Sequence, residues 1–160
     1  MNLRSTNRRL LLRSGAGGLI YAGLVAAGWV KPGTAAAQAW NKDAFESHAL
    51  AEARKALGAG DAAQSVEITF VQTPEIAENG AVVPIGVTST VSKTDAIAIL
   101  IEKNPNPLAA VFEIPSGTEA SISTRIKMAQ TSNVYALVRA DGRYYVASKE
   151  IKVTLGGCGG

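Results

Sequence analysis

The stretch VYALVRADGRYYVA, residues 134–147, decides the fold class of this chain. Asp141 and Gly142 lie between two runs with strand-like composition, and such a pair is a strong signal for a two-residue hairpin turn. The stretch therefore predicts two adjacent antiparallel strands, over residues 134–139 and 144–147.

Further short runs on both sides of this hairpin predict more strands. Val66, Ile68 and Phe70 alternate with polar residues, as in a strand with one buried face. Many short strands without intervening helices predict a mainly β chain, folded as an immunoglobulin-like antiparallel β-sandwich. The other expected strands occupy residues 82–91, 96–102, 109–114, 121–128 and 151–155, and turn-forming sequences lie at residues 79–80, 104–107 and 115–117.

One N-terminal helix is expected before the strands, over residues 41–57. Asn41 is a suitable N-cap, and Gly58 and Gly60 supply the stop. The helix has little bulk on its apolar face, so it is expected to pack on something larger. The residues that recur at four-residue spacing on that face are Phe45, Ala49, Ala53 and Leu57.

The net charge of +3 does not indicate a nucleic-acid-binding surface. The chain has 16 Lys and Arg residues against 13 Asp and Glu residues, but five of the basic residues precede Gln38 and no acidic residue does. The rest of the chain therefore carries about −2, and no nucleic-acid partner is expected. The basic residues before Gln38 are Arg4, Arg8, Arg9, Arg13 and Lys31.

Residues 1–37 have the pattern of a cleaved export signal. After the basic start, an apolar run covers residues 15–30, which at about 16 residues is short for a membrane span. Small residues then offer a cleavage site after Ala37 or after Ala39. The mature protein is therefore expected to have no stable membrane anchor; an uncleaved N-terminal anchor is the alternative.

The basic start of this signal ends in the paired Arg8 and Arg9. The pair resembles the twin-arginine export signal, which carries proteins that have already folded. The mature protein is accordingly expected in the periplasm.

The sequence offers few groups for catalysis or metal binding. It contains one histidine, His48, and one cysteine, which are too few ligands for a structural zinc site. A Ser-His-Asp or Cys-His site would need His48, for which a surface or packing role is favoured. We therefore expect no metal, no cofactor and no catalytic residue, and a chain that enzymes act upon.

The last five residues, GGCGG, carry the only thiol. Four glycines around Cys158 remove every neighbouring side chain and most backbone restriction, which predicts a flexible arm formed by Gly156, Gly157, Gly159 and Gly160. Fully extended, such an arm reaches about 17 Å and can enter a narrow channel of another protein. Because no second cysteine exists, the alternatives are an intermolecular disulfide and an incidental flexible end.

The ending VTLGGCGG, residues 153–160, resembles the C-terminus of the SoxY family, the carrier subunits of thiosulfate oxidation. Two internal stretches, residues 102–109 and 124–129, also resemble this family, so that with the signal the resemblance covers nearly the whole chain. It implies that residues 38–155 form a SoxY-like domain. It also implies that Cys158 holds sulfur intermediates covalently.

The resemblance further implies a set of partners. SoxY forms a heterodimer with SoxZ; the cytochrome SoxAX conjugates thiosulfate to the cysteine, SoxB hydrolyses off sulfate, and in some organisms SoxCD oxidises the remaining sulfur. SoxY itself is not the catalyst. Two other functions stay open from the residues: a structural subunit that uses Cys158 for an intermolecular disulfide, and a carrier activated as a thiocarboxylate at Gly160.

Overall fold

The computed structural model of the chain describes residues 40–155. The predicted signal peptide, residues 1–37, and the predicted arm, residues 156–160, lie outside the described residues. The described part therefore covers the predicted sandwich domain from its helical start to the base of the arm.

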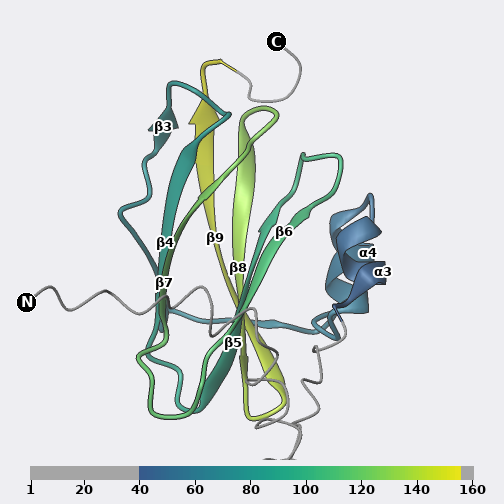
Figure 1. The fold of residues 1–160 in the computed structure, drawn as a ribbon, viewed down its shortest axis with the longest axis vertical. Helices are drawn as coiled ribbons and strands as arrows, with labels where there is room; N and C mark the ends of the chain where they lie inside the picture. Colours follow the sequence, from purple (N-terminus) through teal and green to yellow (C-terminus); the bar gives the residue numbers. More distant parts are fainter. Residues whose placement is uncertain (1–39, 156–160) are drawn as a thin grey trace, which may run out of the picture. The chain divides into compact units, whose positions relative to one another are not determined.

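Two β-sheets pack against each other in this part of the chain (Figure 1). The larger sheet has the strand order β1-β9-β8-β5-β6, with β3 also paired to β9, and the smaller sheet has the order β2-β4-β7. The prediction of a mainly β, immunoglobulin-like sandwich is confirmed. The strands are β1 (Ala63–Gln64), β2 (Ile68–Val71), β3 (Ile76–Ala77), β4 (Val83–Ser89), β5 (Thr94–Ile101), β6 (Leu108–Glu113), β7 (Ser121–Ile126), β8 (Ser132–Ala140) and β9 (Arg143–Val153).

The central strands of the larger sheet are buried on both faces. On β5, Ile97 and Ile99 belong to the core shared with the smaller sheet, whereas Ala98 and Leu100 belong to a second core beneath the helices. Successive side chains of a strand point to opposite faces, so a strand without polar positions needs cover on both sides. This explains why residues 96–101 are all buried.

The helical cover consists of two short helices, so the prediction of one helix over residues 41–57 is wrong. α3 (Lys42–Glu46) ends at Ser47, whose backbone is extended, and α4 (Leu50–Ala56) follows. The Ser47 hydroxyl donates a hydrogen bond to the carbonyl of Asp43 at 2.6 Å. Serine side chains that bond nearby backbone groups compete with helix continuation, and this accounts for the break.

Other features of the predicted helix are confirmed. The Asn41 side chain accepts a hydrogen bond from the backbone N–H of Ala44 at 3.1 Å, and Gly58 adopts a left-handed φ of 79° after α4. Ala53 is fully buried, but Ala49 is exposed because the helix break moves it off the apolar face. Within the described residues, no helix is long and apolar enough to cross a membrane.

Several strand boundaries differ from the prediction. Val66 is 97% exposed and lies before β2, which begins at Ile68. The two strands expected at residues 144–147 and 151–155 are one continuous strand, β9, which runs on through the polar residues 148–150. Leu155 lies beyond the end of β9 and is 65% exposed, so it does not anchor the strand through its side chain.

Two strands have no counterpart in the prediction. β1 pairs in parallel with β9 at residues 145–146, and β3 pairs in parallel with β9 at residues 152–153. Both cover an edge of β9 that would otherwise expose unpaired backbone groups. The sandwich is therefore not purely antiparallel, which corrects that part of the prediction.

The predicted hairpin joins β8 to β9. Asp141 and Gly142 have positive φ values of 51° and 76°, as a two-residue hairpin turn requires, and Ala140 pairs with Arg143 directly before the turn. The turn therefore fixes the register along the whole of β9.

A close approach of β2 to β4 depends on Gly86. A Cβ atom at this position would lie 2.5 Å from the carbonyl oxygen of Val71, a backbone atom that cannot easily move. Gly86→Ala is therefore expected to lower the free energy of unfolding by about 1–3 kcal/mol, measured by urea denaturation. Gly60→Ala is the matched control, since a Cβ there meets nothing within 4 Å. Equal stability of the two variants would contradict the prediction.

Candidate functional site

The predicted carrier residues follow directly after β9. Cys158 and the glycines of residues 156–160 lie outside the described residues, as do Arg8 and Arg9 of the predicted export signal. The structure does describe the point at which the predicted arm begins. We call the last three described residues, Val153, Thr154 and Leu155, the tail root.

Two loops that are distant in sequence hold the tail root. The backbone N–H of Gly80, in the β3–β4 loop, donates to the carbonyl of Leu155 at 2.7 Å. The hydroxyl of Thr131, in the β7–β8 loop, accepts from the backbone N–H of Val153 at 2.9 Å. The two loops are also joined to each other, because the N–H of Met128 donates to the carbonyl of Gly80 at 2.7 Å. Figure 1 shows β3 beside the end of β9 in this region.

A third loop, between β5 and β6, supports this arrangement through Asn104. Its side-chain amide donates to the carbonyl of Lys127 at 2.8 Å and accepts from the N–H of Ala129 at 2.9 Å. One side chain thus holds both sides of Met128, whose own side chain is fully buried in the core. Hydrogen bonds therefore run from Asn104 through the β7–β8 loop and Gly80 to the tail root.

The two internal stretches that resemble the SoxY family meet at this end of the sandwich. Residues 102–109 contain Asn104, and residues 124–129 contain the two backbone groups that Asn104 binds. Their distance in sequence hides this contact, which only the fold reveals. The two stretches and the tail root therefore belong to one connected region.

The surface around the tail root is partly apolar and also carries exposed charged residues of both signs. Leu155 is 65% exposed and Val82 is 56% exposed. Exposed apolar side chains of this kind offer contacts to a protein. The exposed charged residues at this end include Glu78, Lys103, Lys127 and Lys152.

The remaining candidate for chemistry, His48, lies at the surface. It is exposed, and its Nδ1 atom is 3.1 Å from the carbonyl oxygen of Pro105. Within residues 40–155, no group of three or more His, Cys, Asp and Glu side chains is placed to hold a metal ion. The described residues therefore give His48 no carboxylate or metal partner.

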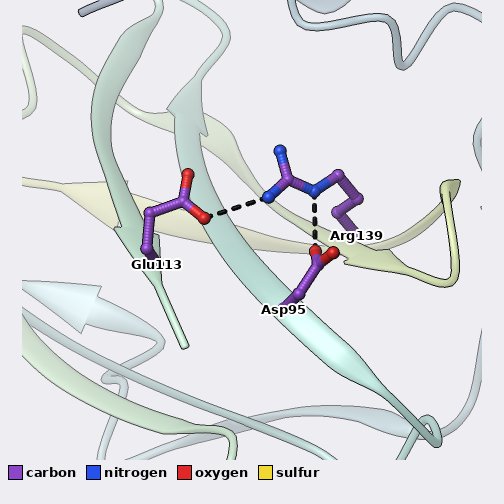
Figure 2. Close-up of polar contacts among 3 residues, drawn as sticks. All are labelled: Asp95, Glu113 and Arg139. Atoms are coloured by element: carbon purple, nitrogen blue, oxygen red, sulfur yellow. Dashed lines mark hydrogen bonds and ion pairs between the residues drawn. The ribbon is translucent and has the colours of Figure 1, made fainter. Parts of the chain in front are cut away.

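An ion cluster joins three strands on the outer face of the larger sheet (Figure 2). Arg139 on β8 donates through Nε to Asp95 on β5 at 2.6 Å and through Nη2 to Glu113 on β6 at 2.9 Å. The hydrogen bond to Asp95 is the main reason that the pKa of Arg139 lies above its ordinary value. The cluster ties the strands together at the Asp141-Gly142 end of β8.

This ion cluster lies far from the tail root. Arg139 pairs with Tyr144 near the hairpin turn, whereas Ser132 pairs with Ile151 at the other end of the same two strands. At about 3.3 Å per residue the two ends are roughly 25 Å apart, beyond the reach of an arm of about 17 Å. The cluster is therefore a structural feature and does not act on the predicted thiol.

Comparison with known proteins identifies the family. Residues 53–158 match the family described as sulfur oxidation protein SoxY. The chain belongs to the SoxY family. The solved structure of the sulfur carrier protein SoxY from Chlorobium limicola f. thiosulfatophilum is 34% identical, with a TM-score of 0.61, and the match covers 71% of this chain and 99% of that chain.

The other matches add little to this SoxY assignment. An engineered protein solved at 1.98 Å resolution is 9% identical, with a TM-score of 0.40, over 55% of this chain and 20% of that chain, which is too little similarity to support an inference. No curated protein matches the chain. The family assignment therefore rests on the SoxY match and on the solved SoxY structure.

Sequence reasoning missed the residues that hold the tail root. Thr131 was not singled out, and Asn79 and Gly80 were recognised only as a turn that separates strands. Their role depends on contacts between segments up to about 75 residues apart, such as Leu155 with Gly80. The only signal was indirect, in the family resemblance of the two stretches that Asn104 joins.

We expect Asn104→Ala to lower the free energy of unfolding by about 1–2 kcal/mol, because two hydrogen bonds to backbone groups are lost. Asn106→Ala is the control from the same loop. The Asn106 amide makes only long contacts, at 3.3 and 3.4 Å, to carbonyls of the helical region, so a loss below about 0.5 kcal/mol is expected. Chemical denaturation of both variants checks this, and equal losses would count against the role of Asn104.

Proposed function

We propose that this SoxY-family protein is a periplasmic sulfur carrier that holds intermediates of thiosulfate oxidation covalently on Cys158. The observation that carries the proposal is the extent of the family match, which runs to residue 158 and so includes the cysteine. The related protein from Chlorobium limicola is named a sulfur carrier protein. Cys158 is the only thiol of this chain, so any carrier chemistry at sulfur falls on it.

The first step of this chemistry is an oxidation. The Cys158 thiolate and the terminal sulfur of thiosulfate form an S–S bond, the thiol proton is released, and two electrons leave the pair. These electrons pass to the haem of a SoxAX-type cytochrome, which is the catalyst of the step.

The later steps act on the sulfur that remains bound. Hydrolysis by a SoxB-type enzyme adds water across the bond between sulfur and the sulfonate group, releases sulfate and leaves a persulfide on Cys158. A SoxCD-type enzyme, where present, oxidises that outer sulfur. The protein itself presents the cargo, and glycines at positions 156, 157, 159 and 160 keep the path to each active site free of side chains.

A SoxZ-like subunit completes the proposed carrier as a heterodimer. The twin-arginine-like signal supports this, because that route exports folded proteins and no cofactor is expected in this chain to explain the need. Folding with a partner that has no signal of its own would explain it. Residues 1–37 would then export both chains.

Intact-mass measurement tests the carrier function. The mature protein, purified without reductant and incubated with thiosulfate and a SoxAX-type cytochrome, is expected to gain mass that a thiol reductant removes. Cys158→Ser is expected to show no such gain, because the hydroxyl cannot form the S–S bond. The matched control, Ser148→Cys in the Cys158→Ser background, places a thiol at an exposed position of β9, outside the tail, and is expected to stay unmodified.

The other outcomes separate the alternatives. A sulfur adduct that survives Cys158→Ser would point to a thiocarboxylate at Gly160. A wild-type protein that forms only a reducible covalent dimer would favour a structural subunit joined through Cys158. Either result would overturn the proposed carrier function.

Replacement of Arg8 and Arg9 by lysine tests the export proposal. The variant is expected to stay in the cytoplasm, and its SoxZ-like partner is expected to stay with it, because the partner has no signal of its own. Cell fractionation followed by detection of both chains measures this. A partner that still reaches the periplasm would contradict joint export.

A further inference from the structure

The tail root is held almost entirely by hydrogen bonds. Val153 is partly buried against the core, but Thr154 is exposed and Leu155 is 65% exposed. Ile151, by contrast, is fully buried. The burial of apolar side chains therefore fixes the chain up to about Val153, and polar contacts decide whether the next two residues are fixed as well.

On one edge of β9, a side chain replaces a missing strand partner. The ladder between β8 and β9 ends where Ser132 pairs with Ile151. One step further, the Thr131 hydroxyl accepts from the N–H of Val153 at 2.9 Å and lies 3.4 Å from its carbonyl oxygen, to which it can donate. Thr131 thus satisfies the backbone of Val153 after β8 has ended.

On the other edge, the β3 strand and the loop after it continue the pairing to Leu155. The N–H of Thr154 donates to the carbonyl of Ala77 at 3.1 Å, and the N–H of Gly80 donates to the carbonyl of Leu155 at 2.7 Å. The Thr154 hydroxyl adds a hydrogen bond to the carbonyl of Glu78 at 3.0 Å. These contacts hold the chain through Leu155, the last described residue.

We infer that Thr131, Thr154 and the segment 77–80 form a clamp that holds the chain in place through Leu155 and so sets the reach of the proposed carrier arm. The inference rests on the proposed function, in which residues 156–160 are an arm that carries the thiol. With the clamp closed, Cys158 is the third residue after Leu155, so the extended chain carries it at most about 10 Å from Leu155. Release of Thr154 and Leu155 would make Cys158 the fifth residue after the last fixed one, Val153, and would lengthen this reach to about 17 Å.

The clamp is rigid because its loop is tied to the core. The Gly80 carbonyl accepts from the N–H of the buried Met128, and the Asn79 side chain accepts from the N–H of Ala81 at 2.8 Å. A short and fixed arm limits where a partner enzyme can take the cargo. Each enzyme must bring its catalytic centre close to the tail root, so the loops around it, with the exposed Val82 and Leu155, are the surface that the enzymes contact.

The single cysteine makes a direct test possible. A nitroxide spin label on Cys158 of the ¹⁵N-labelled mature protein broadens the amide signals of every residue that the label approaches. Thr131→Val with Thr154→Val removes the three side-chain hydrogen bonds of the clamp and keeps the shape of both residues. Thr69→Val is the matched control, since Thr69 is exposed on β2 and its hydroxyl has no hydrogen bond to the described residues.

In the double variant, amide exchange at Val153, Thr154 and Gly80 is expected to accelerate at least about tenfold, while exchange at the centre of β8 stays unchanged. The spin label is expected to broaden the amide signals of residues up to about 7 Å further from the tail root than it does in the wild type. Insertion of two glycines after Leu155 should give the same spread with the clamp intact. The exposed single variant Thr154→Val should show a smaller change of the same kind.

Unchanged exchange in the double variant would overturn the inference, and so would faster exchange without wider broadening, because another contact would then hold the tail root. Failure of the proposed function looks different. In that case Cys158 stays unmodified in the mass experiment, whatever the broadening pattern shows.

Discussion

The pairing of β8 with β9 is the constraint on which the rest of the structure depends. The turn at Asp141 and Gly142 sets a register that runs without interruption from Ala140 and Arg143 to Ser132 and Ile151. A slip of one residue would turn every side chain of β9 to the opposite face. The register therefore decides that Ile151 enters the core, and it decides at which end of the sandwich the chain leaves β9.

At that end of β9, the interactions that hold the chain change. Up to Ile151 the strand is held by a regular ladder and by burial of its apolar side chains. Beyond Ile151, the strand is held by hydrogen bonds to individual groups, such as the Thr131 hydroxyl and the Gly80 N–H. Each contributes about 1 kcal/mol, so the tail root depends on a few individual hydrogen bonds and not on buried apolar area.

The fold was largely predictable because it depends on local patterns. Short strand-like runs separated by turn-forming sequences, together with the Asp141-Gly142 turn, predict the sandwich without knowledge of long-range contacts. The break at Ser47 was not predictable, since four-residue apolar spacing continues through it. β1 and β3 pair over only two residues each, too few to show a period. The thiol at Cys158 was recognised from composition alone, whereas Thr131 acts through a partner 22 residues away and leaves no pattern.

The presence of a single cysteine agrees with the proposed chemistry in a specific way. A persulfide or thiosulfonate on Cys158 is open to attack by any thiolate that can reach it, because thiol exchange at a sulfur–sulfur bond needs no further catalyst. A second cysteine in the same chain would be present at high effective concentration and would discharge the cargo by forming an internal disulfide. The sequence contains no second cysteine. Under the proposed function, a body without thiols would protect the bound sulfur between enzymes.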